Sequence, residues 1–166
     1  MNNLGDLAGT YFTDPNSDPI GFIVPRRGVP ISFRYPTPTA SGIVVGGIND
    51  LRAVAGYYTT ASGALAAFVR QPNGDFVDFV MPGADDTFAY GLNDCGVVVG
   101  RYIAAGSFHG VYGRPGHLHT LDLPGALETS PLGINNLGRI TGHYRDANGA
   151  LHGFVTGPIA FDACDE

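Results

Sequence analysis

Three side chains that could take part in binding or acid–base chemistry occupy one position of a repeated motif. The motif runs from a glycine to a tyrosine at residues 47–58, 91–102 and 133–144, and the residue before its final tyrosine is Tyr57, Arg101 or His143. An arginine guanidinium can donate two parallel hydrogen bonds to an oxyanion, and a histidine exchanges protons near neutral pH. A tyrosine hydroxyl donates a hydrogen bond. Together these groups suit an anionic or carbonyl-bearing small molecule.

Two acidic residues precede the third and fourth copies of the motif and extend this chemistry. Asp86 lies before the third copy and Glu128 before the fourth. We predict a ligand site made of Tyr57, Arg101, His143 and Asp86. The alternative is an enzyme of hydrolase, lyase or cyclase type, in which Arg101, His143, Tyr57 and Glu128 are the candidate catalytic residues. A purely structural role remains open, with Arg101 paired to an acid and His143 filling a gap.

The other histidines and the acidic loops give weaker indications of a site. His109 and His152 share an H-G-[FV] step, which favours a structural hydrogen bond between repeats over metal ligation. His117 and His119 form an H-x-H pair without a third ligand in the sequence, and the acidic links match no Ca²⁺ loop. We therefore predict no metal site and no cofactor.

The signatures of common enzymes do not occur in the sequence. It contains no P-loop, G-x-G-x-x-G, G-x-S-x-G, H-E-x-x-H or C-x-x-C motif. We therefore favour a binding or interaction module whose ligand is a small molecule, a glycan or a protein.

The elements that would position these residues are short strands. Aligned on the asparagine of the motif, four copies begin at Asn2, Asn49, Asn93 and Asn135. Such spacing is typical of propeller blades or helical pairs, and apolar runs of four to eight residues exclude long amphipathic helices. We predict strands at 6–12, 20–24, 30–35, 43–49, 53–59, 65–70, 75–80, 87–93, 97–103, 108–113, 117–123, 130–135, 139–145, 151–156 and 159–163.

This pattern predicts an all-β propeller of four antiparallel repeats, each of about 43 residues. One domain would span residues 1–166, with repeats at about 1–40, 41–84, 85–126 and 127–166, and the first repeat would lack its first strand. An eight-bladed ring made by a homodimer is the alternative. Pairing across the turn would place Arg101 opposite Phe88, at the end of the sheet where the inter-blade links enter and near the ring axis.

Positions that are equivalent in every copy are best explained by the fold. The repeated asparagines would cap the turns through side-chain hydrogen bonds. Glycines such as Gly100 would allow close approach of a neighbour, and glycines such as Gly91 would suit crowding at the axis. Tyrosines such as Tyr102 would pack between blades with their hydroxyls bonded locally.

The repeat resembles the bacterial HAF extracellular repeat family over nearly the whole chain. The resemblance depends on the G-I-N-N-L-G of residues 133–138, on Gly142 and Tyr144, on the H-G-F of residues 152–154, and on P-G-A at 82–84 and 124–126. It implies a propeller-like, exported protein with no assigned reaction. The first copy departs from the pattern, with Ile20 for the histidine and P-T-P at 36–38 for P-G-A.

The composition excludes several classes of partner. A net charge of −6 argues against nucleic acid and anionic membranes, and no apolar run approaches a membrane span. The N-terminus shows no signal peptide, so we expect a secreted or periplasmic protein if a leader has been removed, and a cytoplasmic one otherwise. Cys95 and Cys164 lack metal-ligand spacing, and either redox state fits. A small-molecule or glycan ligand and a homodimer are the expected partners.

Overall fold

The computed structural model describes residues 1–15, 17–37 and 41–159. The described chain folds into fourteen strands and contains no helix. The strands form four antiparallel sheets, two of three strands and two of four. We call these sheets blades 1 to 4 in chain order.

Each blade is a meander in which consecutive strands pair. Blade 1 contains β1 (Leu7–Tyr11), β2 (Ile20–Val24) and β3 (Ile31–Phe33). Blade 2 contains β4 (Ser41–Ile48), β5 (Val54–Thr59), β6 (Leu65–Arg70) and β7 (Phe76–Phe79). Blade 3 contains β8 (Asp86–Leu92), β9 (Val98–Ala104), β10 (Ser107–Arg114) and β11 (His117–Thr120). Blade 4 contains β12 (Glu128–Ile134), β13 (Ile140–Arg145) and β14 (Leu151–Val155).

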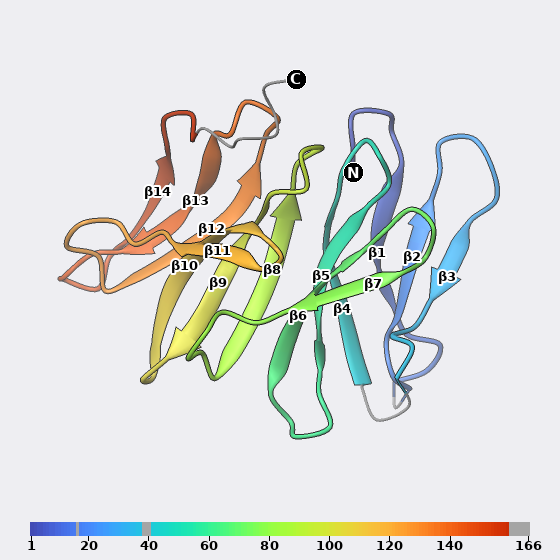
Figure 1. Cartoon of the computed structure of the whole chain (residues 1–166), viewed down its shortest axis with the longest axis horizontal. Coiled ribbons are helices and arrows are strands. Elements are labelled where there is room, and N and C mark those ends of the chain that lie inside the picture. Colours follow the sequence, from blue (N-terminus) through green and yellow to red (C-terminus); the bar gives the residue numbers. More distant parts are fainter. Residues whose placement is uncertain (16, 38–40, 160–166) are drawn as a thin grey trace.

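The four blades follow one another in chain order, with blade 1 at one end of the molecule and blade 4 at the other (Figure 1). The first strand of each later blade packs on the blade before it: β4 on β1 and β2, β8 on β4, β5 and β6, and β12 on β8, β9 and β10. This is propeller packing. Within the described residues the row does not bend back to join blade 4 to blade 1, so the ring is open.

Glycines allow the first strands of neighbouring blades to approach each other closely. A Cβ atom at Gly46 would lie 2.5 Å from the carbonyl oxygen of Ala89, and one at Gly47 would lie 3.1 Å from that of Tyr90. A Cβ atom at Gly91 would lie 3.1 Å from the carbonyl oxygen of Leu132 in blade 4. The prediction that small residues line a crowded axis is consistent with these contacts.

The apolar core lies between the blades rather than in one centre. One cluster joins blades 1 and 2 and includes Ile23, Phe33, Val54 and Phe68. A second cluster joins blades 2 and 3 and includes Val98. Side chains alternate along each strand, so one side of every blade faces the blade before it and the other side faces the blade after it.

The predicted all-β, four-bladed architecture is confirmed, and the first fourteen predicted strands are present. Within the described residues, blade 1 contains no strand before the turn of Asn2, in agreement with the prediction. The fifteenth strand, predicted at 159–163, is not found at Ile159. Its other residues and Cys164 lie outside the described residues.

Candidate functional site

Each blade turns from its first to its second strand position through the repeated asparagine. The side-chain oxygen of this asparagine accepts the backbone N–H four residues later: that of Asp6, Ala53, Val97 or Arg139. The distances are 2.8 to 3.0 Å. The predicted capping role of Asn49, Asn93 and Asn135 is therefore confirmed, and Asn2 caps its turn in the same way.

The side-chain amide of the same asparagine links each blade to the next. Nδ2 of Asn2 donates to the carbonyl oxygen of Asn49 at 3.0 Å, and Nδ2 of Asn49 donates to that of Asn93 at 3.0 Å. Nδ2 of Asn93 donates to the carbonyl oxygen of Asn135 at 3.2 Å. We call this row the asparagine ladder. It runs in one direction, with each donor on the earlier blade.

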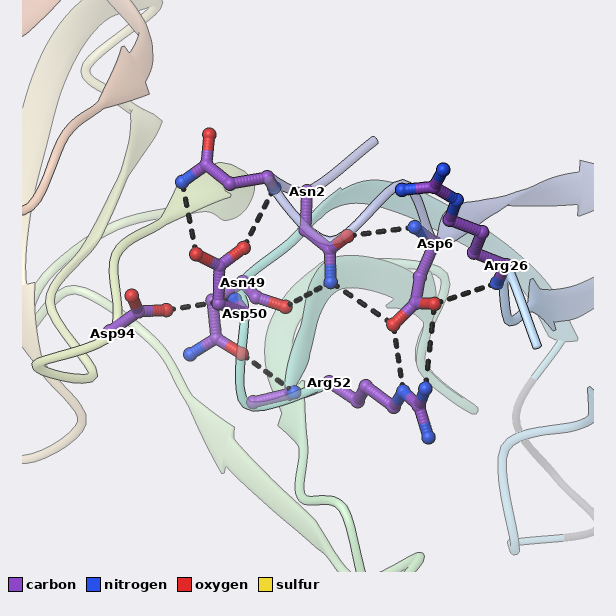
Figure 2. A network of polar contacts seen from close by, with 9 residues as sticks. Asn2, Asp6, Arg26, Asn49, Asp50, Arg52 and Asp94 are labelled. Atoms are coloured by element: carbon purple, nitrogen blue, oxygen red, sulfur yellow. Dashed lines mark hydrogen bonds and ion pairs between the residues drawn. The ribbon is translucent and has the colours of Figure 1, made fainter. Parts of the chain in front are cut away.

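A second row of hydrogen bonds runs beside the ladder, one residue further along each turn. The backbone N–H of Asn3 donates to Asp50 at 2.7 Å, that of Asp50 to Asp94 at 2.8 Å, and that of Asp94 to Asn136 at 2.9 Å. The side-chain amides of Asn3 and Asn136 donate to the second carboxylate oxygens of Asp50 and Asp94. Figure 2 shows the part of this network around Asn2, Asn49 and Asp50.

One turn departs from the others and is linked to blade 1 by an ion pair. Arg52 occupies a position at φ +64°, where the other three turns carry glycine. Its Nε atom lies 2.7 Å from Oδ2 of Asp6, a carboxyl that is only 1% exposed (Figure 2). The hydrogen bond from Arg52, together with the backbone N–H of Arg26, lowers the pKa of Asp6 to about 2. The inter-blade ion pair offsets the strain of a left-handed arginine.

The four turns together enclose a hollow of about 200 Å³ at the turn end of the blades. Each turn contributes its asparagine and the following residue, and the hydrophobic side chains of Ile48, Leu92 and Ile134 complete the wall. Asp50 and Asp94 are the ionisable side chains in this lining, to which Met1 and its α-amino group also belong. The hollow is therefore polar, with two carboxylates and one amino group in its lining.

The predicted ligand residues lie at the other end of the blades, and two of them come together. The ring of Tyr57 packs edge-on against Phe88 at 5.0 Å between centroids. The guanidinium of Arg101 lies 4.1 Å from the centroid of Phe108, 5.2 Å from that of Phe88 and 5.8 Å from that of Tyr90. Arg101 and Phe88 pair across β8 and β9, as predicted. Tyr57 of blade 2 and Arg101 of blade 3 thus both contact Phe88.

The Nε atom of Arg101 is buried and has no hydrogen-bond partner in the described chain. Arg101 therefore does not form the ion pair that the structural alternative assumed, and it stacks on aromatic rings instead. Burial raises the pKa of the neighbouring Tyr90, and the charge of Arg101 opposes that rise. Tyr90 is thus protonated at neutral pH.

His143, Asp86 and Glu128 do not join Tyr57 and Arg101. His143 lies on β13 opposite Gly153, on the side of blade 4 that faces away from blade 3. Oδ1 of Asp86 accepts the backbone N–H of Leu65 at 2.7 Å and so fastens blade 3 to blade 2. Glu128 pairs with Arg145 at 3.4 Å within blade 4. The binding and catalytic roles of this set stay predictions.

His109 and His152 contact neighbours in their own blade. Nδ1 of His109 lies 2.8 Å from Asp122, and Nε2 of His152 lies 2.9 Å from Asp146. The predicted hydrogen bond exists, but the expectation that it joins two blades is wrong, because both partners lie in the same blade. Tyr102 and Tyr144 likewise stack on these histidines within a blade, whereas Tyr58 stacks on Tyr35 of blade 1. Among the described residues no group of three potential ligands could hold a metal ion.

The fold and the hollow define the chain as an open, propeller-type repeat protein. No family model, no curated protein and no solved structure matches it in comparisons with known proteins. The resemblance to the HAF repeat stays a prediction. In the described residues no helix is long and apolar enough to cross a membrane.

Two features of this region were missed by sequence reasoning. The asparagines were assigned to their own turns, and their second role across the blade interface has no local signal. The Asp6–Arg52 pair did have a signal. The position of Asp6 is Ala53, Val97 or Arg139 in the other copies, and the position of Arg52 is glycine in all three others. Paired exceptions of opposite charge in adjacent repeats indicate contact between them.

Proposed function

We propose that the chain is a non-catalytic binding module that takes a small, positively charged ligand in the hollow of the turn end. The observation that supports this proposal is the convergence of the same turn from all four blades on one polar hollow. Repeat proteins form binding surfaces where equivalent loops meet. A volume of about 200 Å³ suits a ligand of a few non-hydrogen atoms.

The charge of the lining favours a cation. Asp50 and Asp94 are partly exposed, and each carboxylate accepts hydrogen bonds from neighbouring amides that fix its position. Oxygen lone pairs remain for a ligand, because a carboxylate can accept about four hydrogen bonds. Because both carboxylates are already held in place, an ammonium group could bind to them without the entropy cost of ordering their side chains.

A titration followed by NMR tests this proposal. Putrescine, choline and ethanolamine are the probes, with glucose and acetate as neutral and anionic controls. We expect the amines to shift the backbone amide signals of the four turns, with dissociation constants on the order of millimolar. Replacing both carboxylates (Asp50→Asn with Asp94→Asn) should weaken binding at least about tenfold while keeping the amide oxygens as acceptors.

Asp85→Asn is the matched control, because Asp85 is an exposed carboxyl outside the hollow. It should leave the titration unchanged. Amide shifts that concentrate around Arg101, or shifts equal for amines and acetate, would contradict a cation site in the hollow. So would binding that survives the double substitution.

A further inference from the structure

The two ends of the asparagine ladder carry complementary hydrogen-bonding groups that no neighbouring blade engages. At the blade 4 end, Nδ2 of Asn135 and the backbone N–H of Asn136 have no acceptor among the described residues, although their equivalents in blades 1 to 3 are all bonded. At the blade 1 end, the carbonyl oxygen of Asn2 and Oδ1 of Asn3 receive no bond from an earlier blade. One end thus offers donors and the other offers the matching acceptors.

The same two ends leave apolar side chains uncovered. Leu7 on the outer side of blade 1 is 46% exposed, whereas Val54 and Val98 at the equivalent position of blades 2 and 3 are 0% and 1% exposed. Tyr11 and Val24 lie on the same outer side of β1 and β2 and are also exposed. The outer side of blade 4 carries Val155, which is 63% exposed.

We propose that a second copy of this chain docks head to tail, so that blade 4 of each copy packs on blade 1 of the other. The contact would continue the interface that already joins each blade to the next. Asn135 would donate to Asn2 of the other copy, and Asn136 to Asn3. Two blade 4 ends cannot meet in this way, because donors would face donors.

The number of copies follows from the repeat count. The described residues contribute four blades that do not close, so a ring built only of copies of this unit has a multiple of four blades. Propellers have four to eight blades. Two copies, related by a two-fold axis along the ring axis, therefore form an eight-bladed ring.

The mass of the protein in solution tests this assembly directly. Analytical ultracentrifugation and native mass spectrometry should give twice the 17.4 kDa of the chain. A monomer at concentrations up to about 100 µM would overturn the proposal, because such a solution excludes any affinity tighter than about 5.5 kcal/mol. Filaments that lengthen with concentration would overturn ring closure.

Two charge substitutions test which surfaces meet. Leu7→Arg alters the outer side of blade 1 and Val155→Arg that of blade 4, and each should raise the dissociation constant of the dimer at least about tenfold, because an arginine would be buried against apolar groups. A head-to-tail contact requires both substitutions to weaken the dimer. An effect of only one of them would indicate a different contact and overturn the proposal.

Val80→Arg is the matched control, since Val80 is 57% exposed on the link between blades 2 and 3. It should leave the dimer unchanged. Asn135→Asp is a second, milder variant that keeps the turn-capping oxygen and removes the Nδ2 donor. It should weaken the dimer while circular dichroism and the unfolding transition of the single chain stay the same. These measurements use no ligand, so their outcome is independent of the proposed cation site.

Discussion

Blade 3 and blade 4 are built from the same repeat and differ in what covers them. In blade 3, Val99 and Asn93 are buried, since blade 3 has a blade on each side. In blade 4, Thr141 and Asn135 take the equivalent positions and are exposed. Ile140, on the side of blade 4 that faces blade 3, is as fully buried as Val98. Whether a repeat position is buried thus depends on the neighbouring blade. The outer side of blade 4 has the same hydrogen-bonding groups as the interfaces between blades, but no blade packs on its side chains.

The largest expected effect comes from a methyl group at a central interface. Gly46→Ala would place a Cβ 2.5 Å from the carbonyl oxygen of Ala89 and 2.7 Å from the Cα of Tyr90, both backbone atoms of the next blade. We expect a loss of about 3 kcal/mol in the free energy of unfolding. In Gly133→Ala the Cβ would meet only the Thr141 hydroxyl at 3.3 Å, so the change should stay within about 0.5 kcal/mol. Urea denaturation measures both, and equal losses would contradict the comparison.

The asparagine ladder gives the next contrast. Asn93→Ala removes the cap of the buried Val97 N–H and the bond to blade 4, and should cost about 2 kcal/mol, since a buried donor is left unpaired. Asn135→Ala leaves N–H groups that water can reach and should cost less than about 1 kcal/mol. Both are to be compared at concentrations where the chain is monomeric. A larger loss for the terminal variant would show that blade 4 is not an open end.

A smaller, pH-dependent effect is expected for the charged link between blades 1 and 2. The folded-state pKa of Asp6 is lowered from 3.8 to about 2, so its contribution to stability is complete above 3.8 and is lost as the pH falls through 2. Asp6→Asn should lower the urea midpoint at neutral pH, and the difference from the parent protein should shrink between these two values. Asp85→Asn is the control and should show no such convergence.

The smallest contrast concerns the variable position itself. Arg101→Met keeps an unbranched, largely apolar side chain and removes the charge from the aromatic rings, so we expect a loss of about 0.5–1 kcal/mol. His143→Ala at the uncovered end should change the free energy of unfolding of the monomer by less than about 0.5 kcal/mol. Thermal denaturation followed by circular dichroism suffices. If His143→Ala were the more costly of the two, a partner for that side chain would have to exist.

Local patterns in the sequence predicted much of this fold. Short apolar runs and turn residues located the strands, and antiparallel pairing across the turn placed Arg101 opposite Phe88. The openness of the ring could not be predicted in this way, because it depends on whether blade 4 reaches blade 1. The same holds for the hollow, since hydrogen bonds such as that from Asn49 to Asn93 join residues 44 positions apart. The predicted ligand site was inferred from the variation of one repeat position between copies. In the structure the side chain of Arg101 packs on aromatic rings, and this packing accounts for an arginine at that position without a ligand.

The left-handed arginine of blade 2 has a consequence for the order of folding. The β8–β9 hairpin turns through Gly96, which adopts its positive φ freely, so it can close by itself. The β4–β5 hairpin turns through Arg52, whose conformation is unfavourable until Asp6 of blade 1 is in place. We expect this hairpin to close late and together with the docking of blade 1, so that Arg52→Gly speeds folding in stopped-flow experiments even as the lost ion pair speeds unfolding. A single residue would then make two neighbouring repeats a single cooperative unit.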